Sequence, residues 1–251
     1  MKNIKEKIFE ITNYQFETFD NAIECAFENL GERLENLNKN NNSREYSYLS
    51  DKLKKGILNF DEYLDQLMKL LRETLCSIGT SFSIEQELKT LSEMRIIYLY
   101  KNIEISIKRI IEIAYPEIKT NSFFNWNSMN NFFKSKHIEL KNVAKYDIYD
   151  QLRLVNNNIK HSEIINKEIK KIKEFKNNEK FDFSTLSEFY MRIYQGIHLF
   201  LNEVGNQIIN ELYLFSDERL TELSNSYKDR MSIKDLNLFI EKLKKPTANN
   251  I

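Results

Sequence analysis

The sequence predicts an all-α protein, and three observations lead to that prediction. Glycine occurs only 5 times and proline only 2 times in 251 residues, which disfavours turn-rich β architectures and nucleotide-binding folds that depend on glycine. Apolar residues recur at helical spacing along most of the chain. No segment shows the alternating pattern of a convincing β-strand, and we find no internal repeat.

The first part of the chain predicts a helical region of its own. Residues 2–38 predict one amphipathic helix or two, and the polar run from Asn38 to Ser43 ends it. A second helical stretch is expected over about 45–78, ending near Gly79. The predicted units are an N-terminal helical region (1–80), a central helical bundle (81–215), and C-terminal helices with a tail (216–251).

The central bundle is predicted to start at a capping box. Ser83 and Gln86 have the spacing of an N-cap residue and its partner three positions later. The helix that they open is expected to reach Ala114 and to stop before Pro116. The remaining expected elements are a short aromatic helix or packed loop (121–136), two long helices (143–175 and 184–215) and two shorter helices (216–229 and 232–244).

The aromatic element carries two interpretations. We interpret it mainly as a plug that packs against neighbouring helices, with base stacking as the alternative. Its apolar residues are Phe123, Phe124, Trp126, Met129, Phe132 and Phe133.

Composition narrows the class of protein further. The formal net charge is zero, which disfavours a globally basic nucleic-acid binder but permits a local basic patch. Cys25 and Cys76 are too few for a disulfide framework, and no two of the 3 histidines have metal-ligand spacing, so we expect neither metal nor cofactor. No apolar run is long enough to cross a membrane and no export signal follows Met1, so a cytoplasmic protein is expected.

The most informative feature lies in the helix predicted over 143–175. Arg153, Asn157 and His161 occupy positions i, i+4 and i+8 and therefore share one face of a helix, within roughly 80°. The polar triplet is thus expected to point away from the local core. The opposite face carries apolar residues at 4-3-4 spacing, namely Ile148, Leu152, Val155 and Ile159.

Residues 83–215 resemble the HEPN superfamily. The resemblance rests on a long helix, a short aromatic element, and then Leu152-Arg153 followed by Asn157 and Lys160-His161. Members of that superfamily are α-helical bundles that commonly dimerise, and many are metal-independent ribonucleases. Their hallmark is an arginine, four to six residues, and a histidine, whereas seven residues separate the pair here. Leu154 stands where a polar residue is frequent, and Glu163 stands where a tyrosine is frequent.

The resemblance implies a HEPN-like bundle with additional helices at both ends and an endoribonuclease activity without a cofactor. The histidine would move protons at a ribose 2′-hydroxyl or a 5′-oxygen, because an unperturbed imidazole has a pKa of about 6.5. The arginine would stabilise the charge on phosphorus. The implied catalytic residues are Arg153, Asn157 and His161, and the supporting residues are Glu104, Asp150 and Lys160.

The implied partners are RNA, a second copy of the chain in a homodimer, and an antitoxin or another defence-system protein, since the family acts in toxin–antitoxin and anti-phage systems. Residues 134–174 contain ten Lys or Arg and six Asp or Glu, a local surplus that would help to hold a phosphate backbone.

The residues also allow a structural interpretation. Asp150 lies three positions before Arg153, so an ordinary ion pair explains the arginine. Asn157 and His161 would then belong to a polar interface. The alternative function is therefore a HEPN-like subunit without nuclease activity that serves in assembly or sensing. Similarly, Glu104 and Lys108 have the spacing of a surface ion pair.

Overall fold

The computed structural model describes residues 3–13, 17–39, 43–119, 123 and 125–244. The all-α prediction is confirmed, because the described residues contain no strand beyond one isolated antiparallel bridge between Ile164 and Lys180. The α-helices are α1 (Ile4–Thr12), α2 (Glu17–Lys39), α3 (Ser43–Lys54), α4 (Phe60–Ala114), α5 (Trp126–Ser135), α6 (Tyr146–His161), α7 (Phe183–Tyr213), α8 (Asp217–Lys228) and α9 (Ile233–Lys244).

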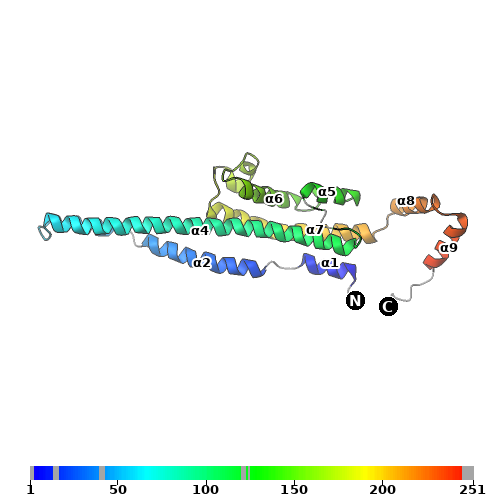
Figure 1. The fold of residues 1–251 in the computed structure, drawn as a ribbon, viewed down its shortest axis with the longest axis horizontal. Helices are drawn as coiled ribbons and strands as arrows, with labels where there is room; N and C mark the ends of the chain where they lie inside the picture. Colours follow the sequence, from blue (N-terminus) through cyan, green and yellow to red (C-terminus); the bar gives the residue numbers. More distant parts are fainter. Residues whose placement is uncertain (1–2, 14–16, 40–42, 120–122, 124, 245–251) are drawn as a thin grey trace.

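Helix α4 is the spine of the molecule, with 55 residues in one continuous helix (Figure 1). It begins at a capping box in which the side chain of Asn59 accepts a hydrogen bond from the Glu62 amide and the Glu62 carboxylate accepts one from the Asn59 amide. The chain turns just before this cap, where Gly56 has a φ of 67°, a conformation that glycine adopts without steric cost.

The predicted helix break near Gly79 and the helix start at Ser83 are both wrong. Both residues lie inside α4, so the expected boundary between residues 80 and 81 also falls within this helix. A glycine inside a helix costs only about 1 kcal/mol, and packing outweighs that cost. Leu70 is buried before this point and Ile84 and Leu88 are buried after it, on the side of α4 that packs against α2 and α3.

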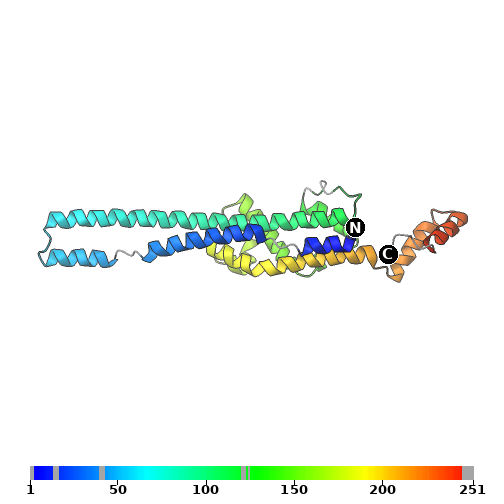
Figure 2. The same ribbon diagram turned by 90° about the horizontal axis from the view of Figure 1, so that it is seen from below.

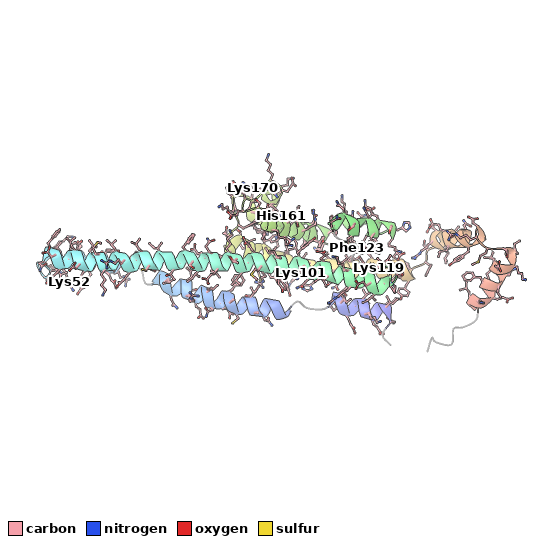
Figure 3. All side chains as sticks on the ribbon, viewed as in Figure 1. Lys52, Lys101, Lys119, Phe123, His161 and Lys170 are labelled. Atoms are coloured by element: carbon pink, nitrogen blue, oxygen red, sulfur yellow. The ribbon has the colours of Figure 1, made fainter. Side chains whose placement is uncertain are left out.

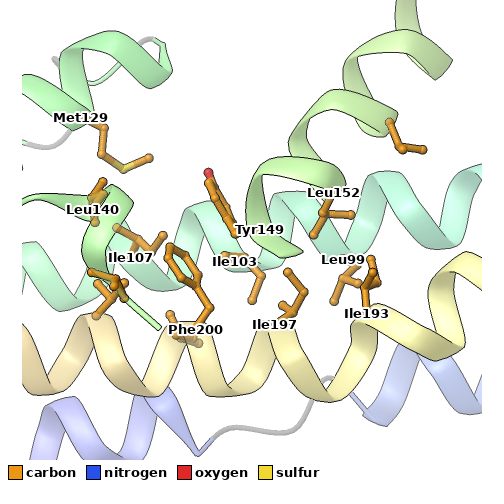
Figure 4. Packing of buried hydrophobic residues seen from close by; sticks show 14 of the residues in the cluster. Leu99, Ile103, Ile107, Met129, Leu140, Tyr149, Leu152, Ile193, Ile197 and Phe200 are labelled. Carbon is orange, nitrogen blue, oxygen red and sulfur yellow. The ribbon is translucent and has the colours of Figure 1, made fainter. Parts of the chain in front are cut away.

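The main core lies where α4, α6 and α7 pack together, and α1 covers α4 and α7 at one end (Figures 1 and 2). Figure 4 shows Ile103, Tyr149 and Phe200 meeting between these helices. Gly196 lets α6 approach α7 closely, because a Cβ at that position would lie 2.3 Å from the Cδ1 atom of Ile148. This contact holds the helix that carries the Arg–Asn–His triplet directly on the core.

The helix predicted over 143–175 is shorter than expected, because α6 ends at His161. The buried side chain of Asn158 ends it. Its Nδ2 atom donates hydrogen bonds to the carbonyl oxygens of Ser162 and Ile164, and its Oδ1 atom accepts one from the backbone N–H of Asn166. These bonds turn the chain away from the helix axis, and two 3-10 turns follow, η3 (Ile169–Lys171) and η4 (Lys173–Phe175).

The helical stretch predicted over about 45–78 is split into α3 and the start of α4. The remaining helices lie close to their predicted positions. Helix α7 starts one residue early because Asp182 caps it, and α8 and α9 agree with prediction within one residue. The N-terminal stretch forms both α1 and α2. Within the region 121–136, Trp126–Ser135 form the short helix α5, which is one of the two expected alternatives, and Met129 and Phe133 are buried in the main core. Phe124 lies outside the described residues.

Candidate functional site

The polar triplet of α6 lies on one side of a helix whose other side is core. Leu152 and Val155 are fully buried, as the sequence pattern predicts. Asn157 and His161 are exposed and Arg153 is half-buried. His161 is the last residue of the helix, and Figure 3 shows it near the segment that carries Lys170. Eight helical residues correspond to roughly 12 Å along the helix axis, so Asn157 lies midway between the other two residues.

Arg153 forms an ion pair with Asp150, as their spacing in the sequence predicts. Its Nε and Nη2 atoms lie 3.0 Å and 2.7 Å from Oδ1 of Asp150. The two side chains are 23% and 32% exposed, so water screens this pair only in part. A guanidinium has five N–H donors, and these two bonds leave several donors of Arg153 for a ligand.

A cavity of about 360 Å³ connects α6 to α4 and α5. It brings together three of the residues that the sequence analysis gives as catalytic or supporting, Glu104, Arg153 and Asn157. Glu104 bonds to Lys108 at 2.7 Å, which is the ion pair that their spacing suggests. The complete lining is Tyr100, Glu104, Asn125, Trp126, Asn127, Met129, Arg153 and Asn157.

Neither His161 nor Lys160 lines this cavity, although Lys160 lies near Tyr100, which does. The Lys160 ammonium is 5.9 Å from the centre of the Tyr100 ring, a cation–π distance. Among the described residues His161 has no hydrogen-bond or ion-pair partner. The site therefore has two parts, a lined cavity at Arg153 and an open histidine further along the same helix.

Tyr149 lies beneath the cavity and carries a polar atom without a partner. Its ring is fully buried and stacks on Phe200 with the ring centres 4.6 Å apart. Figure 4 shows the hydroxyl pointing away from the core toward the side of α5 and α6. That oxygen has no hydrogen-bond partner in the described part of the chain, although Tyr100 lies close enough to affect it. Burial raises the pKa of Tyr149 well above its usual value of 10.0.

Replacing Tyr149 by phenylalanine is therefore expected to leave the free energy of unfolding unchanged or to raise it by about 1 kcal/mol. The substitution removes a buried hydroxyl that has no hydrogen-bond partner of normal geometry among the described residues, and an unsatisfied group of this kind costs about 1–3 kcal/mol. Urea unfolding of the two proteins measures the difference. A loss of more than 1 kcal/mol in the phenylalanine variant would contradict this description of the hydroxyl.

Sequence reasoning pointed to Trp126, for which base stacking is the alternative interpretation, but it missed Tyr100 and the aromatic wall that the two rings form together. Tyr100 precedes Glu104 by one helical turn, so the same face of α4 supplies both. Trp126 is the only tryptophan of the chain, and its ring lies 5.1 Å from that of Tyr149. Helix periodicity places these residues on faces, but it does not pair α5 with α6. That pairing is what creates the cavity.

A second and larger cavity, of about 700 Å³, lies between the end of α5, α7 and α8. Two of its charged residues already bind each other, since Nη2 of Arg219 lies 3.3 Å from Oε1 of Glu211. Burial and the hydrogen bond to Glu211 raise the pKa of the adjacent Tyr115. We therefore assign the candidate site to the smaller cavity beside α6.

The other two histidines lie elsewhere. His137 is exposed in the turn after α5 and has a φ of 58°. His198 on α7 packs edge-on against the ring of Tyr194, with 4.9 Å between the ring centres. No group of three or more His, Cys, Asp or Glu residues that could hold a metal ion occurs in the residues that the structure describes.

Comparison of the chain with protein-family models, with curated proteins and with solved structures gives no match. Fold and site together define the class of protein as an all-α helical bundle with a polar cavity beside α6. None of its described helices is both long and apolar enough to span a membrane.

Proposed function

We propose that this protein is a metal-independent endoribonuclease of HEPN type that acts through the polar face of α6. The observation that carries the proposal is the arrangement of Arg153, Asn157 and His161. The first two line a cavity with aromatic walls, and the histidine stands exposed on the same side of the helix. A phosphate over Asn157 would lie about 6 Å along the helix axis from both other residues.

The cavity has the chemistry that a nucleotide requires. Trp126 and Tyr100 offer aromatic surfaces on which a base can stack. Asn127 and Asn157 offer amide donors and acceptors for the edge of a base. Arg153 provides a cation for the adjacent phosphate, and Asp150 fixes the orientation of that cation.

The proposed reaction is an attack of the ribose 2′-oxygen on the neighbouring phosphorus. His161 accepts the proton of the 2′-hydroxyl, a bond forms between the 2′-oxygen and phosphorus, and the bond from phosphorus to the 5′-oxygen breaks. Arg153 stabilises the additional negative charge in the transition state. The leaving 5′-oxygen takes a proton from His161 of a second copy in a homodimer. The products are a 2′,3′-cyclic phosphate and a 5′-hydroxyl.

The experiment incubates the full chain with total RNA in the presence of EDTA and maps the ends of the fragments. We expect cleavage by the wild type that leaves 2′,3′-cyclic phosphates. A His161→Asn variant should lose at least about 100-fold in rate, because general acid–base catalysis contributes that much. His137→Asn is the matched control, since it removes another exposed histidine and asparagine tolerates the positive φ at that position.

Equal cleavage by wild type and His161→Asn would contradict the proposed role of the histidine. Absence of cleavage by the wild type would favour the second candidate function, an assembly or sensor subunit without nuclease activity. The bonds from Arg153 to Asp150 favour this alternative, because an ion pair inside the chain accounts for the arginine without RNA. In either case we propose a role in toxin–antitoxin or anti-phage defence, with an antitoxin or defence protein as partner.

A further inference from the structure

The first half of α4 carries an apolar stripe that no other described part of the chain covers. Figure 2 shows this half lying beside α2 and α3 alone, beyond α6 and α7. At 100° per residue the members of the stripe fall within an arc of about 80°. Each of them is between 40% and 67% exposed. We name as the distal stripe Phe60, Leu64, Met68, Leu71, Leu75, Ile78 and Phe82.

The distal stripe differs from the apolar face that holds the hairpin together. That inner face contacts α3 and α2 through other residues of α4, including the buried Leu70 and Ile84. The helix also carries no charged residue from Thr74 to Ile84, although Leu75, Ile78 and Phe82 in this segment are exposed. A solvated helix face normally has charged residues on it. An exposed apolar patch of this length marks an interaction surface.

We propose that the distal stripe binds the distal stripe of a second copy of this chain, with the two α4 helices antiparallel. The area supports a stable contact of this kind. In the register that the flanking charges favour, the five stripe residues from Phe60 to Leu75 overlap and offer roughly 500 Å² on each copy, so the two copies together reach the roughly 1,000 Å² that a specific interface needs. A twofold axis lets one patch serve both partners, because residue i then contacts residue j in both directions.

The charges beside the stripe determine the orientation. Asp65 and Arg72 lie on the same flank of α4, the one that faces away from α2 and α3. In a parallel pair each of them would face the opposite flank of the other copy. That flank carries uncharged residues, namely Tyr63, Leu67 and Thr74. A twofold axis across the helices near Met68 instead puts Asp65 of one copy opposite Arg72 of the other, twice in each dimer. The antiparallel arrangement is therefore the one that we propose.

The first test measures the mass of the full chain by sedimentation velocity over a concentration series. Met68→Glu/Leu75→Glu places two charges in the distal stripe. Because both positions are exposed in the single chain, the circular dichroism spectrum should stay unchanged. The mass should fall to half that of the wild type. Gln66→Glu/Thr80→Glu adds the same charges at exposed positions of α4 outside the arc and should keep the wild-type mass. A monomeric wild type, or an unchanged mass in the stripe variant, overturns the proposal.

The second test addresses orientation with charge exchange. Asp65→Arg and Arg72→Asp should each weaken association, and the double variant should restore it, because the exchanged charges again face each other. A failure of the double variant to restore association overturns the antiparallel register.

A photo-crosslinking residue at position 75 identifies what covers the stripe. It should label residues near 62 of the second copy. The register that puts Asp65 opposite Arg72 pairs positions whose numbers add up to about 137. Labelling of residues 216–244 would make the C-terminal helices the occupant, and labelling of another protein would make that protein the occupant. Both outcomes overturn the proposal.

This proposal does not depend on the proposed nuclease activity. His161→Asn should leave the mass of the assembly unchanged, while the stripe variants should leave the cavity beside α6 unaltered. If a wild-type dimer persists in the stripe variants and dissociates only when α6 is changed, the homodimer of the nuclease proposal stands and the distal stripe proposal fails.

Discussion

Replacing Arg192 by alanine is expected to cost about 3 kcal/mol in the free energy of unfolding, a typical value for removing one partner of a buried ion pair. Arg192 on α7 places Nε 2.6 Å and Nη2 3.0 Å from the two carboxylate oxygens of Glu174, and Nη2 also donates to Gln151 of α6. The Glu174 side chain is only 4% exposed. Without the guanidinium this buried carboxylate keeps a backbone hydrogen bond and the ammonium of Lys173, which lies 3.7 Å away.

The same pair predicts how stability depends on pH. Burial raises the pKa of Glu174, but the hydrogen bonds and charge of Arg192 outweigh burial and hold the pKa below its ordinary value of 4.5. A lowered pKa in the folded state means that the pair stabilises the wild type above pH 4.5 and that this contribution is lost as the pH falls through the lowered value. In Arg192→Ala burial dominates, so acidification toward pH 5 should reduce the deficit of the variant.

Urea unfolding at pH 7 and pH 5 measures both effects. Lys171→Ala is the control, because Lys171 and Glu168 form an i,i+3 pair in which both side chains are mostly exposed, and such a pair contributes at most about 1 kcal/mol. A deficit for Arg192→Ala that is no larger than the deficit for Lys171→Ala would show that the Arg192–Glu174 pair does not fasten α7 to η4.

Replacing Phe200 by alanine is expected to cost about 3–5 kcal/mol, the usual range for a fully buried phenylalanine. Phe200 lies at the centre of the α4, α6 and α7 core, where its ring stacks on Tyr149 and meets the edge of Tyr146. The empty volume would form directly under the candidate site. Position 199 provides the control, since Leu199 is 53% exposed on the same helix and its replacement by alanine should cost much less.

The free energies come from denaturant unfolding of the full chain, and near-ultraviolet circular dichroism reports on the packing of the aromatic rings. If Phe200→Ala and Leu199→Ala lose similar amounts, the core does not lie where the structure places it. A large loss for Phe200→Ala alone would support the position of α6 on α4 and α7.

Helix content and most helix ends follow from the sequence. The start of α4 does not, because two pairs of residues have the spacing of a capping box. Ser83 with Gln86 and Asn59 with Glu62 share the same three-residue spacing, and only the second pair caps a helix. The difference is tertiary, because Ile84 continues an inner face that packs on α2. A local pattern does not reveal that packing. Likewise, the side chain of Asn158 ends α6 through bonds to residues that lie further along the chain.

The sequence predicts which residues of the candidate site share one face of α6, but it does not predict which residues of other helices lie beside them. The spacing of Arg153, Asn157 and His161 places them on one face, and the pairing of Arg153 with Asp150 is confirmed. The aromatic walls at Tyr100 and Trp126 depend on how α5 docks between α4 and α6. The catalytic role of the triplet is a proposal that rests on its resemblance to HEPN proteins and on this geometry.

The histidines provide the most direct test of whether RNA binds the α6 face. The chain has only 3 of them, so their imidazole signals can be followed separately by NMR during titration with a short 2′-O-methyl RNA that cannot be cleaved. The proposed nuclease function predicts a saturable change in the signal of His161, while the signals of His137 and His198 stay unchanged. The change at His161 should be lost in Arg153→Ala. Binding of the RNA without a change at His161, or no binding to the wild type, would contradict it.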